Sequence, residues 1–259
     1  MAVFEQKNLL NIWWFPREFC QSAYGEFRHS GTNSCTLISL ILANEMAKEL
    51  VFKSNTARSL PTRAVEIFAH AMNEGNALYG RIFNDISTED SRKRRAPNLN
   101  IPEAVEALVS QRYMDFCLQE WFYTHITANS TNENYSQSVS SRIADVMKLA
   151  IRLSKRSLRN NEGARNLFAA VISDNRTTMF VFDLSSHIVS FFDSHQHGRK
   201  AGAVIALCAI DGLEELANWF VTMGEEVYHS RPPVYEISLL TTTTDARNLT
   251  APPPLLDNV

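Results

Sequence analysis

The sequence has few cysteines, and none of them lie close together. Its four cysteines are spread over 259 residues, at Cys20, Cys35, Cys117 and Cys208, and no CxxC pair is present. Zinc sites made of thiolates are usually built from such pairs. We therefore predict no metal centre and no cofactor, and we expect the four thiols to be free, as in a reducing compartment.

Long hydrophobic runs and an excess of one charge are also missing. No run of about 18 apolar residues occurs, so the sequence predicts no membrane span. The net charge is −3 and 20% of residues are charged, which gives no overall field toward nucleic acid or an anionic membrane. The beginning of the chain, MAVFEQK, has no apolar signal-peptide core. We therefore expect no secretory signal and a cytoplasmic or nuclear location.

The apolar residues change their spacing along the chain, and this change predicts the fold class. Helical spacing dominates residues 35–160, whereas strand-like apolar runs dominate residues 165–241. We expect one α+β domain over residues 1–241, in which the helical part packs on an antiparallel β-sheet. Residues 242–259, which include three consecutive prolines, are expected to form a disordered tail.

Two segments of the helical part carry further expectations. Residues 4–28 contain seven aromatic side chains, so we expect this segment to pack on the domain or, failing that, to form a partner interface. A helix is predicted from about residue 61 to residue 83. Gly75 and Gly80 lie inside it, and glycine weakens helices, so we expect a break or a kink there.

The stretch GTNSCTLISLILA, residues 31–43, contains the first candidate for chemistry. Leu37, Leu40 and Ile41 fall at helical spacing, which places Cys35 near the first turn of a buried helix. Unpaired backbone N–H groups and the positive end of the helix dipole favour a thiolate there. Cys35 is therefore a candidate nucleophile, although a small buried cysteine would show the same local pattern.

A second candidate cluster follows the strand pattern of residues 187–192, in the sequence DSHQHG. Alternate residues of an extended chain project to the same side, so Asp193, His195 and His197 can share one face. A thiol nucleophile needs a base, and the base needs an orienting group. His195 with Asp193 fits these roles; His197 as the base is the alternative, and a polar turn at a strand end is a third interpretation.

These two blocks, GTNSCTLISLILA and HIVSFFDSHQHG followed by GAVIA, resemble the papain-like deubiquitinases. They are most similar to the ubiquitin-specific protease type of the herpesvirus large tegument protein. The resemblance implies a papain-like cysteine protease fold, in which Cys35 is the nucleophile and Asp193 and His195 form the Asp-x-His pair. It also implies that Gln21, upstream of the cysteine, helps to bind the oxyanion. A surface role for Gln21 is the alternative, and Cys20 is a rival nucleophile without a helix start beside it.

The resemblance implies a thiol-dependent isopeptidase or protease that acts on ubiquitin or a ubiquitin-like modifier. The alternative is a catalytically inactive papain-like domain that serves as a protein-protein interaction adaptor. Its partner could bind the aromatic N-terminal segment, the basic helix at residues 148–159 or the proline-rich tail. The basic run Arg92–Arg95 would suit nucleic acid, but the net acidity and the lack of a recognised reading module argue against that partner.

Overall fold

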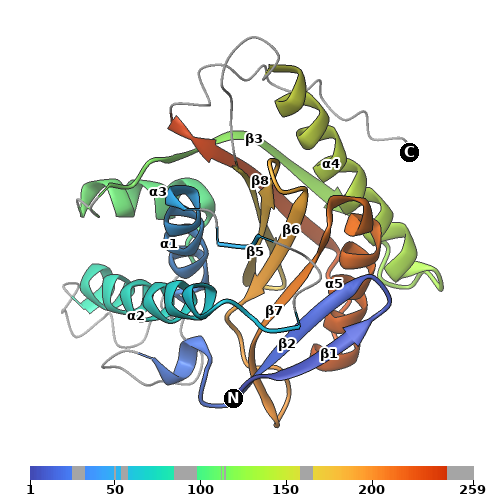
Figure 1. Cartoon of the computed structure of the whole chain (residues 1–259), viewed down its shortest axis with the longest axis horizontal. Helices are drawn as coiled ribbons and strands as arrows, with labels where there is room; N and C mark the ends of the chain where they lie inside the picture. Colours follow the sequence, from blue (N-terminus) through green and yellow to red (C-terminus); the bar gives the residue numbers. More distant parts are fainter. Residues whose placement is uncertain are drawn as a thin grey trace.

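One eight-stranded antiparallel sheet forms the centre of the computed structural model (Figure 1). The strand order is β1-β2-β7-β6-β5-β4-β8-β3. The predicted α+β class, with helices packed on an antiparallel sheet, is confirmed. The structure describes residues 1–24, 33–49, 51–53, 58–84, 98–111, 113, 115–157 and 166–243.

The strands are β1 (Val3–Lys7), β2 (Leu10–Pro16), β3 (Leu118–Thr127), β4 (Asn166–Ser173), β5 (Arg176–Asp183), β6 (Ile188–Asp193), β7 (Ala201–Ala209) and β8 (Val234–Thr242). The α-helices are α1 (Cys35–Lys48), α2 (Thr62–Asn84), α3 (Ile101–Ser110), α4 (Tyr135–Ser157) and α5 (Leu213–Tyr228). Two short 3-10 helices are η1 (Gln21–Ala23) and η4 (Ile210–Gly212).

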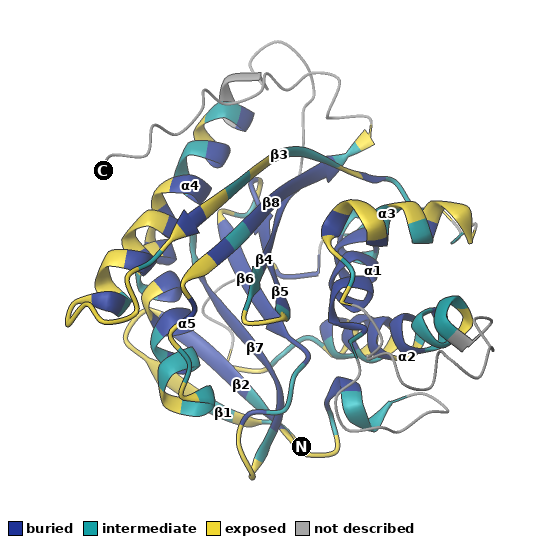
Figure 2. Cartoon of the chain, turned by 180° about the vertical axis from the view of Figure 1, so that it is seen from behind, coloured by how far each residue is buried: buried dark blue, intermediate teal, exposed yellow. Residues whose placement is uncertain are grey.

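Helices cover both faces of the sheet, so the molecule has three layers (Figure 1). Side chains along β5 alternate between two cores: Phe180 and Phe182 pack in the core that contains α4 and α5, and Met179 and Val181 pack in the core that contains α1 and α2. Strands β4 to β7 are therefore buried on both faces (Figure 2). Such strands read as nearly continuous apolar runs, which is the pattern the sequence shows.

A two-residue hairpin joins β4 to β5. Ser173 pairs with Arg176, and the two turn residues between them, Asp174 and Asn175, have positive φ angles of 50° and 59°. Asp and Asn tolerate this left-handed conformation better than most residues, and it matches the twist of paired strands. The turn fixes the register of β5 and so brings the start of this strand to the N-terminus of α1.

The aromatic N-terminal segment forms strands β1 and β2, which the sequence analysis did not predict. Asn8 adopts a positive φ in the turn between them, and β2 pairs with β7. Trp13 and Phe15 enter the core under α1, whereas the ring of Trp14 lies 5.9 Å from that of Trp219 on the opposite face. Residues 4–24 of the segment therefore pack on the domain, and the alternative expectation, a partner interface, is not supported for them; residues 25–28 lie outside the described residues.

Helix α2 is continuous through Gly75 and Gly80, so the predicted break is wrong. The reason is the close packing of α2 on α1. A Cβ atom at Gly75 would lie 2.5 Å from Ile38 Cγ1 and 3.0 Å from the Ile38 backbone. The absence of a side chain at this position lets the two helices approach each other, and this contact outweighs the intrinsic weakness of glycine in a helix.

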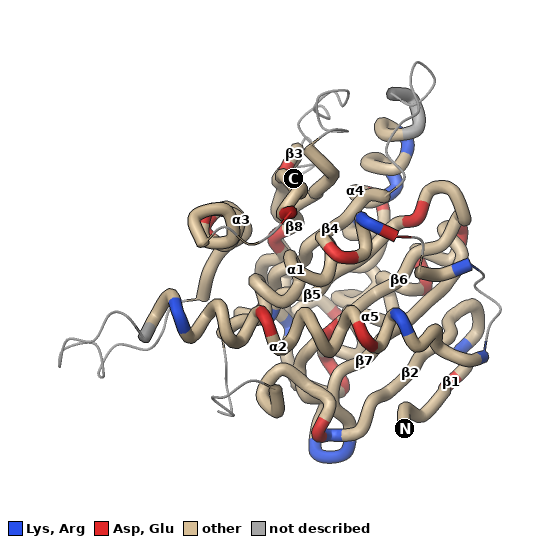
Figure 3. The backbone as a smooth tube through the Cα atoms, turned by 60° about the vertical axis from the view of Figure 1, so that its left-hand side comes forward, with Lys and Arg blue, Asp and Glu red and all other residues tan. Residues whose placement is uncertain are grey.

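Each of the two expected parts also contains an element of the other kind, as the apolar patterns of residues 114–126 and 213–223 indicate. Strand β3 lies in the helical part and α5 in the β-rich part. Strand β8 extends to Thr242, the first residue of the expected tail, while residues 244–259 lie outside the described residues, as do Arg92–Arg95 and residues 158–159 of the expected basic helix. Acidic and basic residues are interspersed over the drawn elements (Figure 3). Across the described ranges, no helix has both the length and the apolarity to span a bilayer.

Two helical glycines allow a matched test of the α1–α2 contact. We expect Gly75→Ala to lower the free energy of unfolding by about 1–3 kcal/mol, because the new methyl group must displace Ile38. Gly224→Ala in α5 meets no atom within 4 Å, so alanine should stabilise the helix there by about 0.5–1 kcal/mol. Urea unfolding measures both values. Equal shifts in the same direction would contradict this explanation of Gly75.

Candidate active site

Helix α1 begins at Cys35, and this position gives the thiol its surroundings. The N-cap residue Ser34 makes no capping bond with its side chain, and Cys35 is only 3% exposed. The first N–H groups of an α-helix have no partner within the helix, and together with the dipole they favour a negative charge. Cys35 Sγ also lies 3.9 Å from the carbonyl oxygen of Asn175, at the β4–β5 turn.

The end of β6 brings a base to this thiol. The imidazole of His195 lies beside Cys35, close enough to act on the pKa of its thiol. Its Nδ1 donates to Asp193 Oδ1 at 2.6 Å, and its backbone N–H donates to the same oxygen at 2.9 Å. The carboxylate therefore occupies Nδ1 and leaves Nε2 for the sulfur. The structure thus brings together three residues that the sequence analysis selected from two blocks more than 150 residues apart in the chain.

The three groups shift one another's protonation. Burial alone would raise the pKa of the Cys35 thiol, but the hydrogen bond and charge of His195, with hydrogen bonds from Thr177, lower it overall. Burial alone would lower the pKa of His195, but the Asp193 carboxylate and the thiolate raise it to about 10. Burial alone would raise the pKa of Asp193, but the charges of His195 and His197 hold it far below its usual range. The site therefore favours a thiolate–imidazolium pair.

His197, the alternative base, lies on the other side of the carboxylate. Its Nε2 is 3.1 Å from Asp193 Oδ2, and its Nδ1 is 2.7 Å from the carbonyl oxygen of Gly202. The ring centroids of Trp14 and Tyr228 lie 5.3 Å and 5.5 Å from that of His197. Because both ring nitrogens have other partners, His197 holds Asp193 in place while His195 faces the thiol.

Gln21, the candidate oxyanion residue, is buried in η1 rather than exposed at the surface. Its backbone N–H donates to the carbonyl oxygen of Ser194 at 2.8 Å, and its side-chain Oε1 accepts from Ser194 Oγ at 2.7 Å. Ser194 stands between Asp193 and His195 in the chain. These two bonds fix the Gln21 segment beside the base, and Nε2 is the donor end of the same amide.

Cys20, the rival nucleophile, is also buried, but it has no imidazole partner of this kind in the described structure. Its Sγ lies 3.2 Å from the carbonyl oxygen of Arg17 and 3.2 Å from Ser22 Oγ. It precedes the three-residue η1 turn, whereas Cys35 starts a helix of 14 residues. The local geometry therefore favours Cys35 as the reactive thiol.

Two contact residues of the site were missed by the sequence analysis. Thr177 hydrogen-bonds the Cys35 thiol, and its Oγ1 lies 2.8 Å from Thr36 Oγ1. Asn76 of α2 accepts a hydrogen bond from Ser34 Oγ at 2.5 Å. No local pattern marks Thr177, because its contact joins positions 141 residues apart. The sequence does contain an indication of Asn76, because this polar residue lies four positions after the buried Met72 and so on the same face of the helix.

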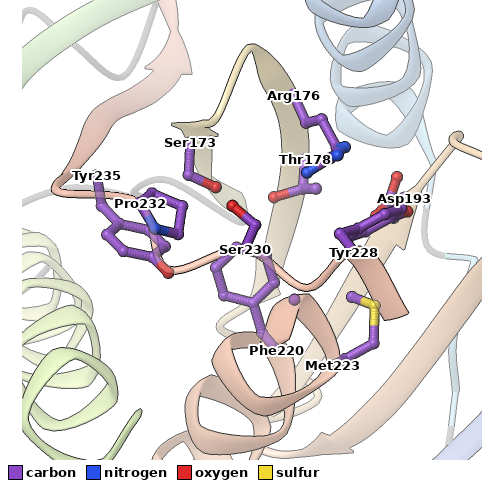
Figure 4. Close-up of a pocket in the computed structure, with 11 residues that line it drawn as sticks. Ser173, Arg176, Thr178, Asp193, Phe220, Met223, Tyr228, Ser230, Pro232 and Tyr235 are labelled. Carbon is purple, nitrogen blue, oxygen red and sulfur yellow. The ribbon is translucent and has the colours of Figure 1, made fainter. Parts of the chain in front are cut away.

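A small pocket, partly open to solvent, lies beside Asp193, toward α5 (Figure 4). The guanidinium of Arg176 stands 3.8 Å above the ring of Tyr228, and this ring lies next to Asp193. Arg176 and Thr178 face this pocket, whereas Thr177, between them, contacts the thiol. The pocket and the thiol therefore lie on opposite faces of β5.

No ion-binding arrangement was found in the described part of the chain: it has no group of three or more His, Cys, Asp or Glu residues placed to hold a metal. A cysteine at the start of a helix, packed against an antiparallel sheet that presents an Asp-x-His pair, is the papain-like arrangement that the sequence resemblance implied. The chemistry that these groups can perform is nucleophilic attack by a thiolate.

No protein-family model and no curated protein sequence matches the chain. Solved structures with a similar fold include the Pseudomonas avirulence protein AvrPphB, at 12% identity and a TM-score of 0.42 over 81% of this chain and 95% of that chain. Another is the ubiquitin-specific protease encoded by the murine cytomegalovirus tegument protein M48, in complex with a ubiquitin-based suicide substrate. It shows 12% identity and a TM-score of 0.44 over 89% of this chain and 84% of that chain. The likeness concerns the arrangement of helices and strands, and the case for the site rests on its own geometry.

The protonation of the site predicts a distinctive pH dependence of thiol alkylation. In the wild type, iodoacetamide should modify Cys35 at a pH below the usual titration range of a thiol, because His195 lowers the Cys35 pKa. Asp193→Asn removes the charge that raises the His195 pKa. We therefore expect the inflection of the rate to move upward in this variant, with less thiolate at neutral pH.

Peptide mass spectrometry at several pH values measures the rate at each cysteine separately. Cys117 provides an internal control, because burial raises the pKa of its thiol and Asp193 is not among the groups that shift it. A wild-type inflection at or above the usual thiol pKa would contradict the predicted ion pair. So would an Asp193→Asn variant whose profile at Cys35 coincides with that of the wild type.

Proposed function

We propose that this protein is a thiol-dependent isopeptidase or protease that acts on ubiquitin or a ubiquitin-like modifier. The observation that supports the proposal most strongly is the placement of the His195–Asp193 hydrogen-bonded pair beside Cys35 at the N-terminus of α1. A buried thiol with a lowered pKa, beside an imidazole with a raised pKa, is an arrangement suited to covalent catalysis.

In the proposed reaction, the Cys35 thiolate attacks the carbonyl carbon of an amide or isopeptide bond. The carbonyl oxygen becomes an oxyanion, and the His195 imidazolium then gives its proton to the departing amine. This leaves a thioester on Cys35 and a neutral imidazole. Neutral His195 next takes a proton from water as the water attacks the thioester. The carboxylic acid product leaves, and the Cys35 thiolate and the His195 imidazolium are regenerated. Asp193 keeps Nδ1 protonated throughout and so maintains the orientation of the ring.

The oxyanion requires donors aimed at the place where the charge develops. The backbone N–H of Cys35 belongs to the first helical turn, and the Gln21 amide is held close to the base by Ser194. Loss of one such donor typically slows the chemical step by about 100- to 1,000-fold. We assign this function to Gln21 Nε2 and to the Cys35 backbone N–H.

The substrate class follows from the resemblance of the Cys35 and Asp193–His195 blocks to the papain-like deubiquitinases. Ubiquitin and its relatives present a carbonyl in an extended C-terminal segment, which can reach a recessed thiol. Cys35 is 3% exposed and the His195 side chain is 13% exposed, so the reacting groups do lie below the surface. A narrow substrate segment suits this depth better than a bulky one.

The low exposure of Cys35 and His195 also favours a second candidate function, a catalytically inactive domain that binds a protein partner. If no substrate carbonyl reaches Cys35, the fold would serve only for interaction. Two of the partner surfaces expected for such an adaptor are weakened by the structure: the aromatic N-terminal segment is mainly packed in the sheet, and Lys148 of the basic helix pairs with Glu214. Reactivity of the thiol therefore decides between the two functions.

A ubiquitin derivative with a C-terminal electrophile tests the proposal directly. We expect the wild-type protein to form one covalent adduct, and Cys35→Ala to form none, because the sulfur that attacks is absent. Cys20→Ala is the matched control, since it removes another buried thiol near the site and should leave labelling intact. Intact-protein mass spectrometry counts the adducts. Labelling of Cys35→Ala would refute the assignment, and folded wild-type protein that stays unlabelled would favour the interaction domain.

A further inference from the structure

A single buried amide joins the turn before the nucleophile to the turn that carries Gln21. Asn76, in the middle of α2, is 9% exposed. Its Oδ1 accepts from Ser34 Oγ at 2.5 Å, and its Nδ2 donates to the carbonyl oxygens of Gln21 and Tyr24 at 2.7 Å and 2.9 Å. Both N–H groups of the amide are thus directed at one segment, and its oxygen is directed at another.

The segment held by these two donors is a single short turn. Helix η1 has three residues and two backbone bonds, from Ala23 N–H to the Cys20 carbonyl at 2.9 Å and from Tyr24 N–H to the Gln21 carbonyl at 3.4 Å. Short 3-10 turns have poorer hydrogen-bond geometry than α-helices, so they depend on outside partners. Asn76 binds the first residue of this turn and its C-terminal cap, and so fixes both ends of it.

Ser194 completes the same arrangement from the opposite side. It accepts from the Gln21 backbone N–H and donates to Gln21 Oε1. The resulting series of hydrogen bonds runs Ser34–Asn76–Gln21–Ser194. Its first member precedes the nucleophile Cys35 in the chain, and its last member precedes the base. The candidate oxyanion residue therefore lies between the two reacting groups and is bonded toward each of them.

We infer that Asn76 is a positioning residue, which holds the Gln21 turn so that the Gln21 amide is aimed at the oxyanion formed by attack of Cys35. This inference rests on the proposed function. Within the described residues, the hydrogen bonds of the Asn76 amide run to Ser34, Gln21 and Tyr24 and not to the reacting groups. It should therefore affect stabilisation of the oxyanion while leaving the thiolate–imidazolium pair as it is, because a misplaced donor is enough to slow catalysis.

Two thiol reagents separate these effects in Asn76→Ala. A ubiquitin C-terminal aldehyde adds the Cys35 sulfur to its carbonyl carbon, and the carbonyl oxygen takes up the thiol proton, so binding depends on the oxyanion donors. Iodoacetamide transfers its carboxamidomethyl group to the same sulfur and releases iodide, without an oxyanion. We expect Asn76→Ala to weaken aldehyde binding by roughly tenfold or more, while the alkylation rate of Cys35 changes by less than about twofold.

A double-mutant cycle identifies the route of the effect. If Asn76 acts through the Gln21 amide, then Asn76→Ala should cause almost no further loss of aldehyde affinity when Gln21 is already alanine. Ser34→Ala is the matched control, because it removes the bond to Asn76 Oδ1 and keeps both donors on η1. It should weaken aldehyde binding less than Asn76→Ala does. Asn76→Asp, which has the same shape but lacks the amide donors, replaces the alanine variant if that one fails to fold.

The outcomes distinguish the inference from the proposed function. Unchanged aldehyde affinity in Asn76→Ala overturns the role of Asn76 and leaves the proposed hydrolase intact. Equal losses in aldehyde binding and alkylation overturn it as well, because they indicate a structural role only. Additive losses in the double mutant show that Asn76 does not act through Gln21. Wild-type protein that alkylates at Cys35 but does not bind the aldehyde refutes the proposed function and, with it, this inference.

Discussion

The buried carboxylate of Asp193 is the constraint on which the rest of the site depends. It is 1% exposed, and removing an ion from water costs several kcal/mol unless partners replace the water. Two imidazoles do so here, each bonded to a different oxygen of the carboxylate. Because His195 must remain protonated on Nδ1 to satisfy one of these oxygens, its other nitrogen is turned toward Cys35. The need to pair a buried charge therefore also sets the geometry of the base.

The end of strand β6 supplies this geometry with three consecutive residues. Asp193 and His195 interact with each other, while Ser194, between them, bonds the Gln21 segment. On the other side, Asn76 ties that segment to the start of α1. The site is thus assembled where a strand end, a helix start and a 3-10 turn meet, and each element is bonded to another. A buried polar network of this kind gives a single geometry only when most of its members have partners.

Local patterns were sufficient to predict part of this arrangement. The glycine-containing turn before an apolar helix pointed to Cys35, and the alternation in DSHQHG pointed to Asp193 and His195, because both signals lie within a few residues. Strands β1 and β2 were missed, since consecutive Trp13 and Trp14 face opposite sides of the sheet and both pack, so no polar–apolar alternation appears. Thr177 belongs to the site only through contacts with α1, which no local pattern encodes. The choice between His195 and His197 required the fold, because it depends on which ring nitrogens already have partners.

The start of a helix adds a further stabilising group to the site. The Cys35 thiolate lies in a place with little water, and the His195 ring beside it is also bonded to Asp193. The N-terminus of α1 offers roughly half a positive charge at that point, and Thr177 adds hydrogen bonds to the sulfur. All of these interactions are internal, so the thiolate is stabilised before any substrate arrives. In the proposed reaction, a substrate would need access to Sγ, which faces the Asn175 carbonyl oxygen at 3.9 Å, and would place its carbonyl group near the Gln21 amide. Under that proposal, recognition is a matter of reaching the sulfur, because the fold already surrounds it with the groups that lower its pKa.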